Sequence, residues 1–131
     1  MEIDLPEVKK EVEAAFALYE TALVTNDVAT LEALFRDDPR TLRYGISENL
    51  YGMHEIREFR RGRSPVGLMR KVARTIITTY GRDFATANTL FYRDSAPGKV
   101  GRQSHTWVRF DDGWHIVAAH VSIIDAPAAQ S

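Results

Sequence analysis

The clearest indication of the fold class is the segment VGRQSHTWVRFDDGWHIVAAHVSII, residues 100–124. Apolar and polar side chains alternate through much of both halves, a period of two that predicts strands over 100–110 and 114–124. The separator, Asp111-Asp112-Gly113, contains an Asp-Gly step, which is a strong signal for a hairpin. The two halves are therefore predicted to pair as neighbouring antiparallel strands.

The same period extends toward the N-terminal side of this hairpin. Residues 71–80 and 84–92 are two further strand-like runs, and short turn-forming segments separate each run from the next. Connections this short join antiparallel neighbours. We therefore expect four successive strands, followed by a small, polar tail from 125 to 131 that is predicted to be loose.

The N-terminal part of the chain has helical periodicity instead. From 4 to 25, apolar residues recur three and four positions apart, which predicts one helix whose apolar face includes Tyr19. Asp4 and Pro6 are good start signals, and Glu7 follows Asp4 at the spacing of a capping box.

Shorter elements are predicted between this helix and the strand-rich half. Asn26 or Asp27 is placed to cap a second, short helix whose apolar positions run to Phe35. The elements after it are a short strand, a loop and a strongly charged helix, at residues 41–46, 47–52 and 53–61.

Helices followed by long antiparallel strands are typical of an α+β fold, in which the long helix packs on one face of a bent antiparallel sheet. With 131 residues, the chain is predicted to form one domain over 1–131. If the sheet curls around the helix, a cavity opens between the two layers, and such cavities commonly hold small molecules.

Composition excludes several classes of protein. The chain has no cysteine, which excludes disulfides, thiolate nucleophiles and cysteine-ligated metal centres. No apolar run is long enough to span a membrane, and the acidic start differs from a signal peptide, so we expect a cytoplasmic protein. A net charge of −1 gives no electrostatic reason to bind nucleic acid. No P-loop, dinucleotide-binding or nucleophile-elbow motif is present, and no cofactor is expected.

Arginine is concentrated in the middle of the chain. Residues 1–35 carry two lysines and eight acidic residues, whereas 36–74 carry nine arginines and one lysine against five acidic residues. A solvated face paired with the acidic N-terminal helix explains most of these arginines as well as a ligand-binding role does. Arg43 differs, because it alternates with apolar residues in its short strand. A guanidinium that faces the interior needs an acid, a carbonyl or an anionic ligand.

Tyr19 and Arg43 are the candidate catalytic pair. Tyr19 lies on the apolar face of the first helix, where a tyrosine usually packs and its hydroxyl finds a partner. If that helix crosses the strand of Arg43, the guanidinium lowers the pKa of Tyr19 and makes the phenol a workable acid–base group.

Three of the four histidines fall in the predicted strands, and of these His115 is interpreted as a surface residue. His105 and Trp107 share a face of 100–110, and His120 and Ser122 share a face of 114–124. A histidine in such a strand is more often a hydrogen-bonded core residue than a catalyst, so both roles stay open. No metal is expected, because the chain has no His-Glu-x-x-His motif.

Several segments resemble one known family. The segment 113–122 is similar to the last strand of the SnoaL-like, nuclear transport factor 2-like superfamily, and residues 5–125 resemble the AtzH-like family, which includes proteins labelled for oxalurate catabolism. The resemblance implies the cone-shaped nuclear transport factor 2-like fold, with a cavity between a strongly bent sheet and the first helix. The segments that carry it are 26–28, 34–35, 41–45, 48–52, 56–63, 101–107 and 113–122.

The resemblance also implies an activity and an assembly. It implies a homodimer and a cofactor-free decarboxylating amidohydrolase that acts on a small N-carboxylated urea such as 1,3-dicarboxyurea. It places the working tyrosine on the first helix and the working arginine on the first strand, which here are Tyr19 and Arg43. Because such a ligand is dianionic, arginines should bind it. Our candidate substrate-binding residues are Arg60, Arg63, His105, Trp107, His120 and Ser122.

Two other classes of function remain open. The chain could be a non-catalytic binding or assembly partner of a ureide amidase, with the acidic first helix as the contact. It could also be a cavity isomerase or dehydratase, which predicts an uncharged, apolar ligand instead of an anion.

Overall fold

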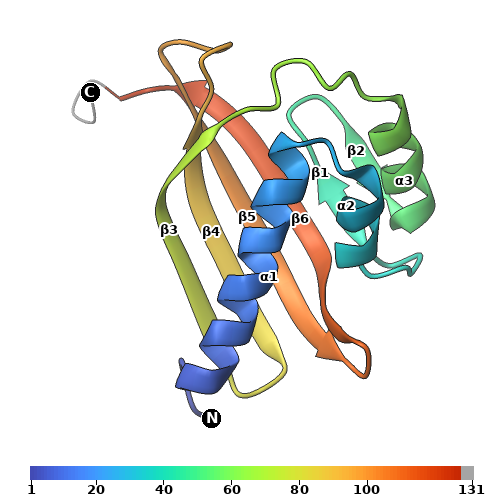
Figure 1. Ribbon diagram of the computed structural model, residues 1–131, viewed down its shortest axis with the longest axis vertical. Coiled ribbons are helices and arrows are strands. Elements are labelled where there is room, and N and C mark those ends of the chain that lie inside the picture. The colour runs from blue at the N-terminus through green and yellow to red at the C-terminus, as the bar shows by residue number, and fades with distance from the viewer. Residues whose placement is uncertain (128–131) are drawn as a thin grey trace.

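The structure is a computed structural model that describes residues 1–127, and in it one six-stranded sheet packs against three helices (Figure 1). Helix α1 crosses one face of the sheet, α3 lies beside the first two strands, and α2 packs against the other two helices and the last strand. The helices are α1 (Pro6–Val24), α2 (Val28–Leu34) and α3 (Gly52–Gly62). The strands are β1 (Leu42–Tyr44), β2 (Asn49–Tyr51), β3 (Lys71–Tyr80), β4 (Phe84–Tyr92), β5 (Lys99–Phe110) and β6 (Gly113–Asp125).

The sheet is mixed, whereas the sequence predicted a wholly antiparallel one. The strand order is β2-β1-β6-β5-β4-β3, and every neighbouring pair is antiparallel except β1 and β6, which run parallel. The prediction is correct for β3 to β6, which short turns connect. It is wrong for the pairing of β1 with β6. These two strands lie far apart in the sequence and no hairpin joins them, so they can run parallel. Strand β2 was predicted as loop, and it is a three-residue partner of β1.

The start of α1 differs from the prediction, whereas the start of α2 agrees with it. No side chain caps α1, and the Asp4 carboxylate instead accepts a hydrogen bond from the Thr79 backbone N–H at 2.9 Å. The predicted capping box is therefore wrong, and the contact joins the N-terminal segment to β3. For α2, the residue that caps is Asp27, which accepts a hydrogen bond from the Thr30 backbone N–H at 3.2 Å.

The end of the described chain is tied to the sheet. Strand β6 continues to Asp125, which pairs with Lys99, and the Ala126 backbone N–H donates to the Gly98 carbonyl at 2.9 Å. The prediction of a loose tail from 125 is wrong for these two residues, since backbone pairing holds them. The rest of that predicted tail, 128–131, lies outside the described residues.

The core lies between α1 and the sheet. The predicted apolar face of α1 is buried over five of its six positions, which are Val8, Val12, Phe16, Tyr19 and Leu23. The strand positions beneath this face include Ala85, Ala87 and Ala119, whose small side chains let the helix pack closely. Within residues 1–127, no helix is both long and apolar enough to span a membrane.

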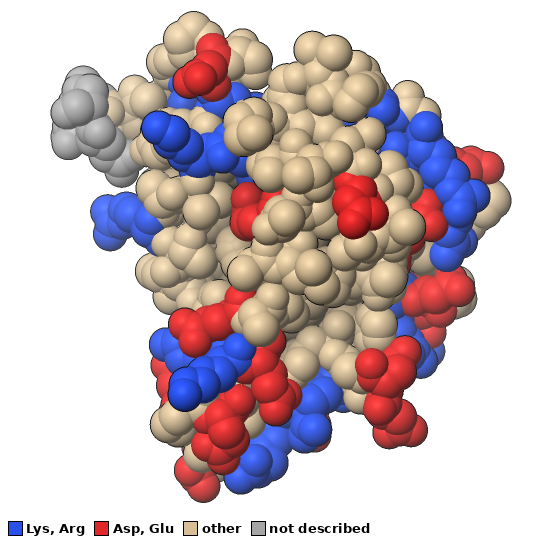
Figure 2. Space-filling model, viewed as in Figure 1, with Lys and Arg blue, Asp and Glu red and all other residues tan. Residues whose placement is uncertain are grey.

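Two arginines of α3 are paired with an acidic side chain. Figure 2 shows basic and acidic groups mixed over the face that carries α1, with no single basic patch. Arg57 and Arg61 of α3 both approach Glu32 of α2, at 3.7 and 2.9 Å. These two arginines therefore have an acidic partner, but it lies on the second helix and not on the acidic N-terminal helix that the sequence interpretation named.

Gly101 of β5 lies under an aromatic ring. A Cβ at this position would overlap the ring of Phe91, which is buried. Replacing Gly101 with Ala is expected to lower the free energy of unfolding by about 1–3 kcal/mol, because a packed ring must move. Urea denaturation measures this change. The control is Gly62→Ala, since nothing lies within 4 Å of its added Cβ, and equal stability of the two variants would contradict the prediction.

Candidate functional site

A cavity of about 360 Å³ opens between α1, the end of α3 and the sheet, a size suited to a small molecule. Tyr19 and Leu23 line it from α1, while Gln103 of β5 and Val121 of β6 line it from the sheet. Another wall is the segment between α3 and β3, where Ser64, Val66, Gly67 and Leu68 line the cavity.

Positive charge dominates the lining of this cavity. Four arginines contribute to the lining, and Glu48 is the one acidic residue among the lining side chains of residues 1–127. A recess with such an excess of guanidinium groups fits an anionic ligand, because arginine binds carboxylates with paired hydrogen bonds. The four arginines are Arg43, Arg63, Arg70 and Arg93.

Arg43 is buried, as its position in the strand predicted, and its partner is an acid. Its side chain reaches Glu48, where Nη1 donates to Oε1 at 2.7 Å. Burial alone would raise the pKa of Glu48, but hydrogen bonds from Arg43 and Ser47 outweigh it and hold the pKa below its ordinary value. Gly45 makes room for this pair, since a Cβ there would overlap the Glu48 carboxylate.

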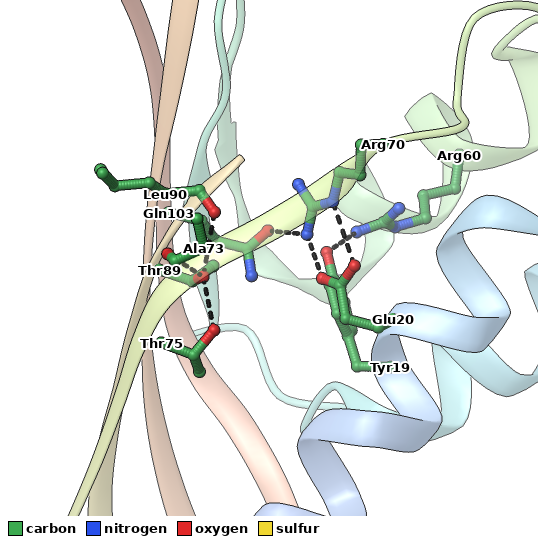
Figure 3. Close-up of polar contacts among 9 residues, drawn as sticks. All are labelled: Tyr19, Glu20, Arg60, Arg70, Ala73, Thr75, Thr89, Leu90 and Gln103. Carbon is green, nitrogen blue, oxygen red and sulfur yellow. Dashed lines mark hydrogen bonds and ion pairs between the residues drawn. The ribbon is translucent and has the colours of Figure 1, made fainter. Parts of the chain in front are cut away.

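Arg70 joins three parts of the fold (Figure 3). It directly precedes β3, pairs with Glu20 of α1, and donates from Nη2 to Oε1 of Gln103 at 2.8 Å. The carboxylate of Glu20 therefore neutralises Arg70 at the edge of the cavity.

Arg63 and Arg93 lack such a partner. No carboxylate among residues 1–127 lies within 4 Å of either guanidinium, and the Nε of each is buried without a hydrogen bond. Burial, together with the charges of Arg60 and Arg43, lowers the pKa of Arg63 to about 10. Burial and the charge of Arg70 likewise lower the pKa of Arg93. Both groups would gain from an anion in the cavity.

Tyr19 lies among these charges, and the residue as a whole is 1% exposed. Its hydroxyl oxygen accepts a hydrogen bond from Arg60 Nη2 at 3.2 Å (Figure 3). Burial raises the pKa of Tyr19, but the charges of Arg60, Arg43 and Arg70 outweigh it and bring the pKa below its ordinary value of 10.0. Arg43 thus acts on Tyr19 through its charge, and the guanidinium that touches the phenol belongs to Arg60.

Arg60 lies behind Tyr19 and does not line the cavity. It is 2% exposed, its Nε and Nη1 have no hydrogen-bond partner among residues 1–127, and aromatic rings flank it. The Phe35 and Tyr19 ring centroids lie 5.4 and 5.9 Å from its Cζ. The structure therefore places Arg60, a predicted substrate-binding residue, against the Tyr19 hydroxyl and not in the lining of the cavity.

His105 and Trp107, which the sequence offered as substrate-binding candidates, are core residues, and the structure does not bring them to the cavity wall. Both are buried and neither lines the cavity. The His105 ring stands edge-on to Tyr19, with centroids 4.6 Å apart, and neither ring nitrogen has a hydrogen-bond partner among residues 1–127. Burial, reinforced by the charges of Arg70, Arg60 and Arg43, lowers the pKa of His105 well below 6.5, so the imidazole is neutral.

His120 and Ser122 lie on the opposite face of the sheet. Their neighbour Val121 lines the cavity, and side chains alternate between the two faces along a strand. His120 is exposed beside Tyr44, with ring centroids 6.1 Å apart, and Ser122 accepts a hydrogen bond from Arg102 Nε at 3.2 Å. The structure therefore does not bring these two predicted substrate-binding residues to the cavity.

Sequence reasoning missed three of the charged residues that line the cavity. Glu48, Arg70 and Arg93 lie in or beside turns, where charged side chains are usually solvated, so no local pattern distinguishes them. The strand ends that bring Arg70 and Arg93 to one place were predicted, but the path of the connecting segments was not. Across residues 1–127, no group of three or more His, Asp or Glu side chains is arranged to hold a metal ion.

The neutral His105 predicts a loss of stability in mild acid. The unfolded chain binds a proton near the ordinary pKa of 6.5, whereas in the folded protein the pKa lies well below that value. As the pH falls below 6.5, only the unfolded state takes up this proton, so stability decreases by up to about 1.4 kcal/mol per pH unit.

Replacing His105 with Phe is expected to remove this contribution while keeping a ring in the core. Urea unfolding at pH 7 and pH 5 gives the difference for wild type and variant. His54→Gln is the matched control, because His54 is exposed beside Glu58 on α3. A variant that loses as much stability in acid as the wild type would overturn the prediction.

Comparison with known proteins gives two findings. The AtzH-like family profile matches residues 1–127, and no curated protein matches the chain. Among solved structures, a protein of unknown function from Pectobacterium atrosepticum is 51% identical, with a TM-score of 0.91 over 94% of this chain and 95% of that one. A cystatin-like fold protein from Burkholderia xenovorans is 49% identical, with a TM-score of 0.93 over 97% and 99%.

A more distant structure extends the likeness of fold. A nuclear transport factor 2-like superfamily protein from Salmonella enterica is 24% identical, with a TM-score of 0.73 over 93% of this chain and 94% of that one. At that identity the likeness concerns the fold alone. The predicted α+β, nuclear transport factor 2-like fold is confirmed.

Proposed function

The chain belongs to the AtzH-like family, and from that premise we propose that it is an enzyme that removes CO2 from a small, doubly negative N-carboxylated urea such as 1,3-dicarboxyurea. The observation that carries this proposal is the Tyr19 hydroxyl at the wall of a cavity lined by four arginines. An uncharged, apolar ligand, as an isomerase or dehydratase would bind, would leave the guanidinium groups of Arg63 and Arg93 unpaired. The lining therefore favours an anion.

The hydroxyl of Tyr19 is free to act as a proton donor. Arg60 donates to its oxygen, and among residues 1–127 no acceptor receives the phenolic hydrogen. That hydrogen can therefore be donated to a ligand in the cavity. The lowered pKa of Tyr19 makes the phenol a stronger acid than tyrosine in water, which suits a proton donor near neutral pH.

The proposed step breaks the bond between one carboxylate carbon and a urea nitrogen. CO2 leaves, the electron pair stays on the nitrogen and spreads toward the urea carbonyl oxygen, and the nitrogen takes the Tyr19 proton. Water then returns a proton to the tyrosinate. Arg43 stabilises the negative charge that develops on the carbonyl oxygen, an effect worth a few kcal/mol in preorganised sites. Hydration of the released CO2 makes the overall reaction a decarboxylating hydrolysis.

The experiment is a direct assay of CO2 release. Freshly prepared 1,3-dicarboxyurea labelled with carbon-13 in its carboxylates is followed by NMR, with and without protein, because N-carboxylates also lose CO2 unaided. The expected result is a rate that rises in proportion to protein concentration. A rate equal to the uncatalysed one would overturn the enzymatic proposal. Under that outcome, a stable complex with a ureide amidase in gel filtration would favour the assembly-partner function.

The predicted homodimer remains part of the proposal. Sedimentation equilibrium measures it, and a mass equal to one chain at assay concentration would remove it without affecting the proposed chemistry.

A further inference from the structure

The four cavity arginines form two pairs, each of which rests on one phenylalanine ring. A guanidinium over an aromatic face is held by attraction to the ring, and two such groups on one ring are held at one wall. The Phe59 pair is Arg43 and Arg63, whose Cζ atoms lie 5.5 and 5.8 Å from the ring centroid. The Phe91 pair is Arg70 and Arg93, at 4.4 and 5.0 Å.

The two pairs enter the cavity from different walls. The Phe59 pair comes from β1 and the end of α3, whereas the Phe91 pair directly precedes β3 and directly follows β4. In the sheet, β6 and β5 lie between β1 and β4, so the usual strand spacing separates β1 from β4 by about 14 Å. Val121 of β6 and Gln103 of β5 line the cavity between the two pairs.

Each pair contains one neutralised arginine and one without an acid. In the Phe59 pair, Glu48 holds Arg43 at 2.7 Å, and in the Phe91 pair, Glu20 holds Arg70. The other members, Arg63 and Arg93, have no carboxylate within 4 Å among residues 1–127. The cavity therefore presents one uncompensated positive charge on each of two walls.

We propose that the cavity is a two-sided clamp for a dianion, in which Arg63 binds one carboxylate and Arg93 binds the other. These two residues then set a preference for dianions over monoanions, because a monoanion leaves one partly buried guanidinium unpaired. The inference rests on the proposed function, since it specifies the substrate class of the same site. Neither residue is required to move a proton.

The test compares two probes that differ by one charge. Glutarate has the same number of chain atoms as 1,3-dicarboxyurea, does not decarboxylate, and carries two carboxylates. Monomethyl glutarate keeps the chain and carries one. Isothermal titration calorimetry is expected to give a Kd for glutarate about 10- to 100-fold below that for the monoester, the usual range for a charge-assisted hydrogen-bonded pair.

Arg63→Met and Arg93→Met are each expected to bring the Kd for glutarate up to about that for the monoester. Arg102→Met is the matched control, because Arg102 lies on the outer face of β5 beside Ser122 and its loss removes the same charge. It should leave the ratio of the two Kd values unchanged. Arg63→Lys and Arg93→Lys keep the charge and replace a Met variant that does not fold. They should give a ratio of the two Kd values between those of the wild type and the Met variants.

The outcomes separate this inference from the proposed function. Equal affinity of the wild type for both probes, or an unchanged ratio in the Arg63 and Arg93 variants, would overturn the clamp even if the protein releases CO2. A ratio that depends on both residues, without any CO2 release, would support the clamp and refute the enzyme.

Discussion

Tyr19→Phe is expected to lower kcat for CO2 release by about 10²- to 10⁴-fold, the usual contribution of a general acid or base. The substitution keeps the ring that packs edge-on to His105 and removes only the hydroxyl that faces the cavity. Glutarate affinity should change little, because the clamp arginines remain. Steady-state kinetics on the labelled substrate measures the first effect, and calorimetry measures the second.

The pH profile gives a second readout for Tyr19. As a proton donor the phenol must be protonated, so the wild-type kcat should fall as the pH rises through the lowered pKa of Tyr19, below the ordinary 10.0. The Tyr19→Phe variant should lack this alkaline decline. Tyr44→Phe is the control, since Tyr44 lies away from the cavity and its hydroxyl bonds that of Tyr51. Full turnover by Tyr19→Phe would eliminate the proposed role.

Arg60→Met is expected to raise the free energy of unfolding of the ligand-free protein by about 1–4 kcal/mol, as replacement of buried charges by apolar side chains often does. The reason is that the Arg60 guanidinium is buried, has one hydrogen bond, and has no carboxylate within 4 Å among residues 1–127. Methionine fills a similar volume without a charge. Urea denaturation at neutral pH measures the change.

The same variant should lose activity. Without the Arg60 charge and hydrogen bond, the pKa of Tyr19 rises, so the alkaline decline of kcat moves to higher pH and kcat falls at neutral pH. Arg61→Met is the matched control on α3: its exposed pair with Glu32 contributes about 0–1 kcal/mol, and it should not alter the pH profile. A less stable Arg60→Met variant, or an unshifted profile, would refute this account of Arg60.

Much of the fold could be predicted from periodicity. The four long strands, the three helices and the buried face of α1 follow from local patterns, because side-chain spacing reports which face of an element is covered. The parallel contact between β1 and β6 could not be predicted in this way. It joins segments about 75 residues apart, and no local pattern records which distant strand a short strand meets.

The residues of the candidate site likewise divide into those that local sequence patterns could identify and those that they could not. Tyr19 and Arg43 could be identified because each carries a polar group at a position that an apolar pattern predicts to be buried, and both line the cavity. The roles of Arg60, His105, His120 and Ser122 could not be assigned, because the sequence does not say which face of β6 meets α1 or what lies behind Tyr19. A shift of one residue along a strand reverses the face that a side chain occupies.

Local sequence patterns are enough to predict the α+β class, the helix that carries the phenol, and the supply of arginine from which an anion site could be built. Which guanidinium groups are neutralised and which are not depends on how the chain folds. This neutralisation depends on contacts such as Arg70 with Glu20, which come from α1 and the start of β3. The net charge of a cavity depends on side chains from segments that lie far apart in the sequence. Only the packing of those segments brings these side chains together.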